Sequence, residues 1–377
     1  MRVFRGLIAS FFLISGYSGV CFGSPTIAGV HNEVQPDATF ISVVVDGLNL
    51  GERPNIVYYN DFRKELAFTS LSAGGQLAGT TRLRLGNVPM VSVYNSTPGF
   101  LAIDDTVDKL TIVEAFLGEA QSKVFLSYSV AIPEGYTAPA STEPKKWYEG
   151  SSWKLSWLLE SPQAYSQSAE FDLCAPTMVG SNSALMGNSS LFVSVPSGFS
   201  YFHAKVSDWW AWDVFNHMQV VFSGDLDDPL RSAGSFSVVN SRIKYINFPH
   251  KSDTTAYKGP SPKITQINFP GWVRNTAEDK FQAIYSNIYV SAGDNFLSRV
   301  EITDSAEYTK SQYRRVVFPT EWTPTRIKFD IYKSEIKANT DIFMHYFDAN
   351  GIQVGGAHKV CTHCPMPVTP SSSPAVN

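Results

Sequence analysis

The chain has 377 residues, of which 44% are hydrophobic and 17% charged, a balance that excludes a disordered protein and predicts two or three folded domains. Its net charge of −4, with no basic stripe, argues against a nucleic-acid partner. Aromatic residues make up 13% of the chain, which favours strands and supplies flat apolar faces for binding.

The first 23 residues have the three parts of a secretory signal peptide. Arg2 and Arg5 give a positive start, an apolar run covers 7–14, and Cys21 and Gly23 occupy the positions before a cut. No segment reaches the ~20 apolar residues that a membrane helix needs. We therefore expect a secreted, periplasmic or cell-surface protein without a membrane span. Lipidation of Cys21 is an alternative that its larger preceding residue, a valine, disfavours.

Residues 24–60 form the first predicted segment of the folded chain. An apolar strand at 40–46 leads into a turn at 47–51 that carries two glycines, and glycine allows the backbone conformations of a tight turn. Together with the stretch at 25–30, this pattern resembles the opening of an IPT (immunoglobulin-like, plexin and transcription factor) domain, with Leu50 in place of the usual Phe. The resemblance implies an Ig-like β-sandwich.

The segment around 110–117 fits two kinds of secondary structure. Leu110, Val113 and Leu117 share one face of a helix that a polar residue at 104–106 would cap. A strand over 109–116 fits the same residues, so both readings remain open. No alternation of strands with helices follows, which disfavours a parallel α/β fold.

Period-two alternation of apolar with small or polar residues is the main signal elsewhere in the chain. It predicts strands at 124–132, 153–159, 284–290, 325–331 and 342–346. A turn at 348–351 follows the last of these, because its Asn-Gly pair supplies the positive φ angles of a tight hairpin. Many short strands separated by turns are typical of β-sandwiches.

The block at 61–295 resembles a laminin G-like or concanavalin A-like sandwich. The segments that carry the resemblance are 123–132, 153–159, 213–222 and 281–292. In exported bacterial proteins of this type the last strand commonly reads Asp-Asp-Ile-Tyr-Val-Ser, and its counterpart at 286–291 lacks both acids. The resemblance implies an all-β jelly-roll sandwich, which is the fold class that we expect.

The segment at 296–364 resembles the final strands of an Ig-like domain. It forms either a separate module or one domain with 24–60, in which case the lectin-like block is inserted between the two halves. The remaining residues, 365–377, are rich in Pro and Ser and predict a disordered tail.

The densest aromatic cluster is the predicted ligand site. It comprises Trp209, Trp210, Trp212 and His217. Sugars present C–H faces that stack on indole rings, so these side chains would bind a glycan. The alternative is core packing, but neighbours on a strand face opposite sides, so Trp209 and Trp210 cannot both be core residues of a strand.

An acidic loop follows this cluster. Asp225, Asp227 and Asp228 place three carboxylates within four residues, and oxygen ligands of this kind suit calcium. The spacing is not that of an EF-hand, and a solvated turn between strands is the alternative. Calcium is the cofactor that this sequence suggests.

Three cysteines remain if Cys21 leaves with the signal peptide. Cys361 and Cys364 stand where the fold is expected to end, and we predict a disulfide between them because exported proteins meet oxidising conditions. A metal site that adds His358 and Cys174 is the alternative.

Catalysis is the harder function to support from this sequence. Glycoside hydrolysis needs two carboxylates that face each other across a sugar. Glu301, Asp304 and Glu307 look similar to the acidic strand of concanavalin-like glucanases, but Asp304 lies an odd number of residues from Glu301 and would face the other side. We therefore expect non-catalytic binding of a polysaccharide or cell-surface glycan. A polysaccharide lyase or glycoside hydrolase, and a structural or adhesive surface protein, remain alternatives.

Overall fold

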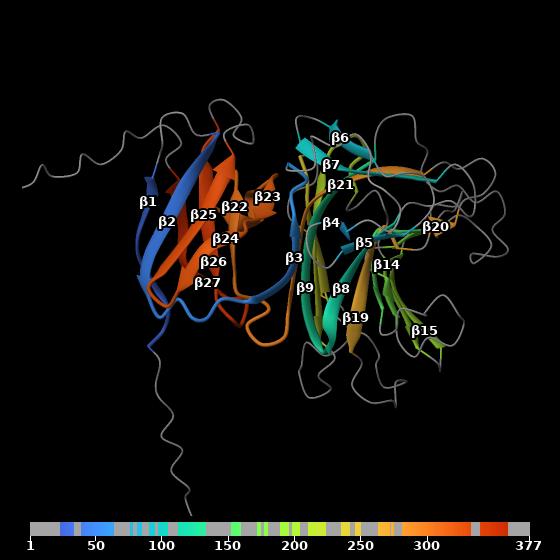
Figure 1. The fold of residues 1–377 in the computed structure, drawn as a ribbon, viewed down its shortest axis with the longest axis horizontal. Helices are drawn as coiled ribbons and strands as arrows, with labels where there is room; N and C mark the ends of the chain where they lie inside the picture. Colours follow the sequence, from blue (N-terminus) through green and yellow to red (C-terminus); the bar gives the residue numbers. More distant parts are fainter. Residues whose placement is uncertain are drawn as a thin grey trace, which may run out of the picture.

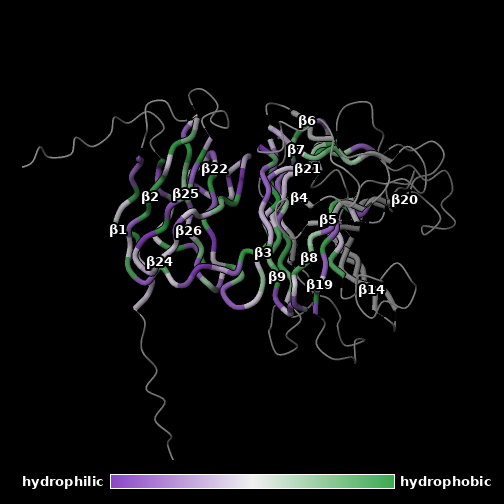
Figure 2. The backbone as a smooth tube through the Cα atoms, viewed as in Figure 1, coloured by the Kyte–Doolittle hydropathy of each residue, from purple (hydrophilic) through white to green (hydrophobic). Residues whose placement is uncertain are grey.

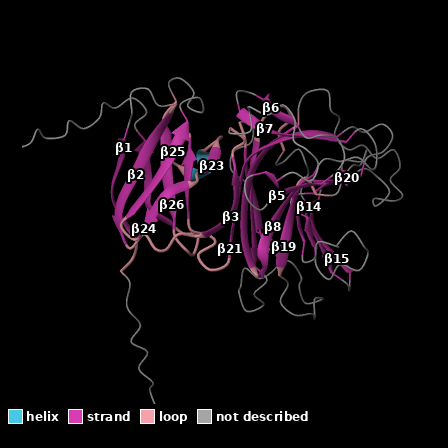
Figure 3. Cartoon of the chain, in the orientation of Figure 1, coloured by secondary structure: helices cyan, strands magenta, loops and turns pink. Residues whose placement is uncertain are grey.

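The computed structural model describes residues 23–33, 39–63, 76–77, 81–84, 90–94, 97–104, 112–132, 152–159, 172–174, 177–179, 189–195, 198–203, 210–223, 235–241, 246–249, 263–271, 273–274, 281–332 and 340–360. Within these ranges the chain forms strands and a single turn of 3-10 helix at Tyr308–Lys310 (Figure 3). This confirms the all-β prediction. None of the described segments is a helix long and apolar enough to cross a membrane.

Two β-sandwiches lie side by side (Figure 1). The smaller one has two four-stranded sheets. Its terminal sheet has the order β1 (Thr26–Glu33), β2 (Phe40–Leu48), β25 (Arg326–Tyr332) and β24 (Pro319–Thr323). Its docking sheet has the order β23 (Arg314–Val316), β22 (Arg299–Thr303), β26 (Ile342–Phe347) and β27 (Gln353–Val360).

The larger sandwich begins with a near sheet, which faces the smaller sandwich. The near sheet has the order β18 (Ile246–Pro249), β17 (Ser235–Val239), β16 (Asn216–Ser223), β9 (Lys123–Ala131), β21 (Phe281–Ala292), β7 (Thr97–Asp104) and β6 (Met90–Tyr94), and β3 (Asn55–Asn60) also pairs with β21.

A far sheet packs on the other side of the near sheet. It has the order β15 (Gly198–His203), β14 (Ser189–Val195), β12 (Asp172–Cys174), β11 (Trp157–Leu159), β19 (Ile264–Phe269), β8 (Ile112–Gln121), β5 (Thr81–Arg84) and β4 (Gln76–Leu77). A three-stranded sheet joins β13 (Thr177–Val179), β10 (Ser152–Lys154) and β20 (Val273–Arg274).

Apolar residues fill the space between the two sheets of each sandwich, and Figure 2 shows the hydrophobic stretches along these strands. The large core contains Leu126, Tyr128, Met218, Ile267 and Tyr285, all at most 1% exposed. The small core joins β2 and β25 to β22 and β26. Burying this apolar surface is the main favourable term in the folding of both units.

The first and last segments of the chain complete one sandwich. Residues Phe40 to Asp46 of β2 pair with β25 in an unbroken antiparallel register. The tight connection after β2 is held to the other sheet of the smaller sandwich, because the Tyr346 hydroxyl of β26 donates a hydrogen bond to Leu50 O. The next strand, β3, pairs with β21 of the near sheet.

Three predicted strands differ in detail from the sequence analysis. The segment around 110–117 is the strand β8, not a helix. The predicted strand at 153–159 is divided between β10 and β11, and at the break the Tyr285 hydroxyl donates to Leu155 O at 3.0 Å. β21 contains a bulge at Asn287, where φ is 49°. The bulge moves the core-facing positions from odd to even residue numbers.

Candidate functional site

The predicted aromatic cluster is divided between two environments. Trp210 is 3% exposed and belongs to the large core, and half-buried Trp212 packs edge-on against it at 5.8 Å between ring centroids. Trp209 lies outside the described residues. Trp210 therefore presents little indole surface to a ligand, as the core-packing alternative expects.

The turn that carries these tryptophans is held by a buried amide. Asn216 Oδ1 accepts from Ala211 N at 3.0 Å and from Asn240 Nδ2 at 2.9 Å. Asn216 Nδ2 donates to Ala211 O at 2.8 Å. The side chain acts as a backbone substitute inside a turn, which fixes the position of Trp212.

His217 faces the opposite side of the near sheet from Trp210. Its Nδ1 lies 2.7 Å from Ser129 Oγ, and its ring packs edge-on against Tyr313 of the smaller sandwich at 5.0 Å. Its neighbour Met218 points into the large core. The structure does not bring His217 together with the tryptophans.

The other predicted site residues lie outside the described part of the chain. These are the acidic loop with Asp225, Asp227 and Asp228, and the pair Cys361 and Cys364. Cys174 is the last residue of β12, where the structure describes its backbone alone. Among the residues that the structure does describe, no three His, Cys, Asp or Glu side chains come together as a metal site.

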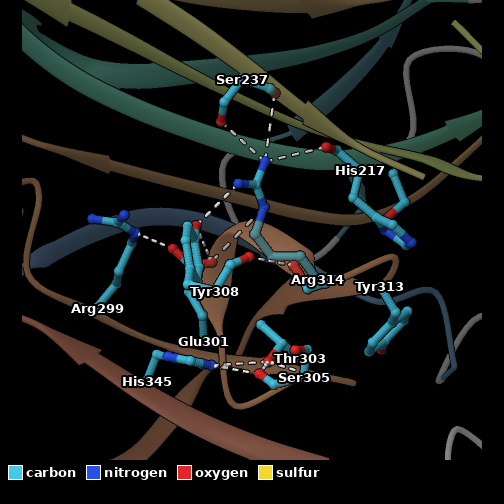
Figure 4. Close-up of polar contacts among 12 residues, drawn as sticks. His217, Ser237, Arg299, Glu301, Thr303, Ser305, Tyr308, Tyr313, Arg314 and His345 are labelled. Carbon is cyan, nitrogen blue, oxygen red and sulfur yellow. Dashed lines mark hydrogen bonds and ion pairs between the residues drawn. The ribbon is translucent and has the colours of Figure 1, made fainter. Parts of the chain in front are cut away.

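The outer face of the near sheet is occupied by the docking sheet (Figure 4). Glu301 has no exposed surface. It accepts hydrogen bonds from Arg299 Nε at 2.5 Å and from the Tyr308 hydroxyl at 2.9 Å. Arg314 Nη1 donates to the same hydroxyl at 3.0 Å, and its Nη2 reaches Ser237 Oγ at 3.0 Å. We call these residues the interface network: Arg299, Glu301, Tyr308, Arg314 and Ser237.

Two further observations describe the charge balance of the interface network. Burial by itself would raise the pKa of Glu301, but Arg299 and Arg314 outweigh it and hold that pKa below its usual range. The Arg299 guanidinium also lies between two rings, 4.6 Å from Phe125 and 4.0 Å from Phe347. The carboxylate is therefore a structural anion, which removes Glu301 as a catalytic candidate.

A polar row crosses the outer face of the far sheet. Trp157 stands directly opposite Asn268, and Asn268 stands opposite Glu114 on the next strand. Directly opposed residues share one face of a sheet. Their neighbours Leu158, Ile267 and Val113 belong to the large core, so the row lies on the other side. We call Trp157, Asn268 and Glu114, with Gln266, the far-sheet row.

The polar groups of the far-sheet row are deeply placed. Glu114 is 6% exposed, and Gln266 and Asn268 are at most 1% exposed. Gln266 Nε2 donates to Asn268 Oδ1 at 2.6 Å, while Gln266 Oε1 accepts no hydrogen bond. A buried acceptor without a donor costs about 1 to 3 kcal/mol of stability. Such a group in a native structure calls for an explanation, and a role in function is one.

A close backbone approach fixes the Trp157 end of this row. Gly271 N donates to Lys154 O at 2.7 Å, and a Cβ on Gly271 would lie only 2.7 Å from Trp157 Cβ. Any larger residue there would displace the indole. Glycine is therefore required beside Trp157, and Lys154 is held next to it.

Comparison with known proteins gives fold-level similarity only. No protein-family model and no curated protein matches the chain. An alginate lyase from a Chlorella virus is similar over 63% of this chain and 100% of its own, with 10% identity and a TM-score of 0.39. A glycoside hydrolase family 16 endo-glucanase from Bacteroides ovatus covers 63% and 99%, with 9% identity and a TM-score of 0.36. A seed lectin from Lotus tetragonolobus covers 58% and 95%, with 6% identity and a TM-score of 0.34.

The far-sheet row is absent from the sequence analysis for a physical reason. Glu114 lies on a segment whose helix and strand patterns were balanced, and Asn268 and Gln266 lie on a strand that no alternation revealed. Their proximity depends on pairing between strands far apart in the sequence. Trp157 is the member of the row that lies inside a strand predicted from the alternation at 153–159.

Proposed function

We propose that this chain is an exported protein that binds a carbohydrate on the outer face of the far sheet. The observation that carries the proposal is the far-sheet row, in which an indole, an amide and a carboxylate lie in line outside the core, with the second amide, Gln266, beside them on β19. Sugars are recognised by this combination of a flat apolar face and convergent hydrogen-bonding groups.

The arrangement of the two sandwiches supports this choice of face. The outer face of the near sheet packs on the docking sheet through the interface network and an apolar cluster that includes Phe125, Tyr289 and Val316. A ligand would have to displace that packing to reach it. We therefore assign the ligand to the outer face of the far sheet, where the side chains of the row are themselves at most 7% exposed.

A carbohydrate-cleaving enzyme is the second candidate. Glu114 favours it, because a deeply buried carboxylate in a polar row is a typical acid or base. Glycosidases use two carboxylates that flank the bond to be broken. Within the described residues Glu114 is the only carboxylate of the far-sheet row, so binding without cleavage has the stronger support.

A screen of the mature protein from Ser24 against a glycan array and insoluble polysaccharides tests the proposal. Each positive is repeated with EDTA, which tests the calcium prediction, and assayed for unsaturated uronates by their absorbance. We expect binding without product, and we expect Trp157→Ala to abolish it while Trp322→Ala, in the smaller sandwich, does not. Loss with Trp212→Ala alone would instead move the site to the turn before β16. Product release that Glu114→Gln removes would favour the enzyme.

A further inference from the structure

The imidazole of His345 lies on the face of the docking sheet that carries the interface network. His345 belongs to β26 and stands opposite Glu301 of β22, and neither side chain has exposed surface. Its neighbours Met344 and Tyr346 point into the small core. The ring therefore lies between the docking sheet and the segment that closes over it, as Figure 4 shows.

The hydrogen bonds of His345 fix a neutral ring. Nε2 lies 3.2 Å from Ser305 O, which can only accept, so Nε2 carries the hydrogen. Nδ1 lies 3.0 Å from Gln353 Nε2, which can only donate, so Nδ1 has a free lone pair. Thr303 Oγ1 completes the contacts of Nε2 at 2.9 Å. Protonation would place two donors against each other at Nδ1.

His345 is in direct contact with the residue that links the two sandwiches. The Tyr308 ring packs edge-on against it at 5.3 Å between ring centroids. The Tyr308 hydroxyl joins Glu301 to Arg314, and Arg314 Nη2 reaches His217 O and Ser237 of the near sheet. A change at His345 therefore reaches the near sheet through one ring and one guanidinium.

The charged groups around His345 act in both directions, since Glu301 favours a protonated ring and His358 disfavours it. The docking sheet presents Arg299 and Glu301 from β22 and Arg314 from β23, and β27 presents His358. One carboxylate thus faces two guanidinium groups that are both nearly fully buried. Adding a proton to His345 would place a further positive charge near these two buried guanidinium groups.

We propose that protonation of His345 weakens the docking of the two sandwiches, so that this protein has an acid-sensitive joint at their interface. Burial lowers the pKa of His345 and His358 acts in the same direction, while Ser305 O, Glu301 and Gln353 act against them. For protonation to weaken docking, the proton must bind the undocked state more tightly than the docked state. The docked state is favoured above the ordinary histidine pKa and loses that advantage as the pH falls toward the lowered value.

Hydrogen exchange on the full mature chain tests this proposal. Wild type and His345→Gln are compared at the same pH, so that the intrinsic rate of amide exchange is the same for both proteins. At about pH 8 we expect wild type and the variant to exchange at equal rates in β16 and β17, the two strands whose backbone is contacted by Arg314. As the pH falls below about 6.5, exchange in these strands should rise by up to about tenfold per pH unit in wild type and not in the variant. His31→Gln, which changes an exposed histidine of β1, serves as the matched control and should behave like wild type.

A second measurement keeps the test decisive if His345→Gln does not fold. The titration of His345 in wild type is followed by NMR, and its midpoint is compared with the midpoint of the exchange change in β16 and β17. Coincident midpoints support the joint. Equal acid responses in wild type and His345→Gln, or an exchange change that begins far from the His345 midpoint, would overturn it.

Discussion

At the residue scale, Asn216 shows how one buried amide holds the tryptophan turn. Its side chain bonds the backbone of Ala211 on both sides and the amide of Asn240. Removal of the side chain leaves several of these groups buried without partners. Because Asn216 has no exposed surface, water cannot replace it easily.

We predict that Asn216→Ala lowers the free energy of unfolding by about 2 to 3 kcal/mol. Urea unfolding followed by tryptophan fluorescence measures the change. Gln312→Ala is the control, since Gln312 is exposed and only its backbone N–H is bonded, to Asp304. A loss below that of the control would mean that the turn keeps its shape without this amide.

Glu301 is the second residue whose effect can be stated in advance. Glu301→Gln keeps the shape but removes the carboxylate that Arg299 and Arg314 contact, and leaves the two buried guanidinium groups beside a neutral amide. We expect a loss of about 3 to 5 kcal/mol, the usual cost of breaking a buried ion pair. Calorimetry measures this loss. Glu307→Gln provides the comparison, because Glu307 forms an exposed ion pair with Lys310.

The same carboxylate predicts a dependence of stability on pH. The pKa of Glu301 is lower in the folded protein than in the unfolded chain, so the unfolded chain binds the proton first. Its contribution is complete above the unfolded value of about 4.3 and is lost as the pH falls through the folded value. Urea midpoints recorded down to about pH 3 should fall more steeply in wild type than in Glu301→Gln. Parallel slopes would show that the arginines do not stabilise the anion.

At the element scale, β21 shows where sequence patterns succeed and where they fail. Period-two alternation predicted its presence, and β25 follows the same rule with buried residues at every second position. The bulge at Asn287 was not predictable, because it depends on one positive φ angle and the register of three neighbouring strands. The predicted alternation of β21 is therefore right only on one side of Asn287.

The left-handed backbone at Asn287 gives a test of the bulge. Glycine adopts this conformation freely, whereas a β-branched residue does not. Asn287→Gly should change the free energy of unfolding by less than about 1 kcal/mol, and Asn287→Val should cost clearly more. Equal effects in thermal unfolding would mean that side-chain contacts, and not the backbone, define this position.

The docking sheet explains why the interface was not visible in the sequence. Arg299, Glu301 and Thr303 alternate with Val300 and Ile302, which is the pattern of a strand with one face in water. In the structure that polar face is buried against the near sheet. No local pattern separates a polar face in water from a polar face that meets a second, equally polar surface.

At the scale of the whole molecule, the two sandwiches are held by arginines and aromatic rings. Arg63 lies 4.3 Å from the ring of Tyr332, and Arg299 of the docking sheet lies 4.6 Å from the ring of Phe125 in the near sheet. Only Leu48 and Ile352 are exposed large hydrophobic residues in the described part of the chain. The described surface therefore carries few large apolar side chains.

Three edge strands of the smaller sandwich are irregular. β1 has a bulge between Ile27 and Gly29, β24 begins with Pro319, and β27 contains Gly355 and Gly356 with positive φ. Bulges, prolines and irregular backbone prevent a further strand from pairing at an edge. These three strands therefore present edges that disfavour pairing with a further strand.

The most direct test of the proposed carbohydrate site is the affinity of four proteins for one glycan that binds in the screen, measured by titration calorimetry. Wild type is compared with Trp157→Ala and with Trp322→Ala, and Glu114→Gln provides a second change in the far-sheet row that keeps its shape. We predict at least about tenfold weaker binding for both far-sheet variants, equivalent to about 1.4 kcal/mol, and unchanged binding for Trp322→Ala. Unchanged affinity in folded Trp157→Ala and Glu114→Gln would contradict a carbohydrate site on the far sheet.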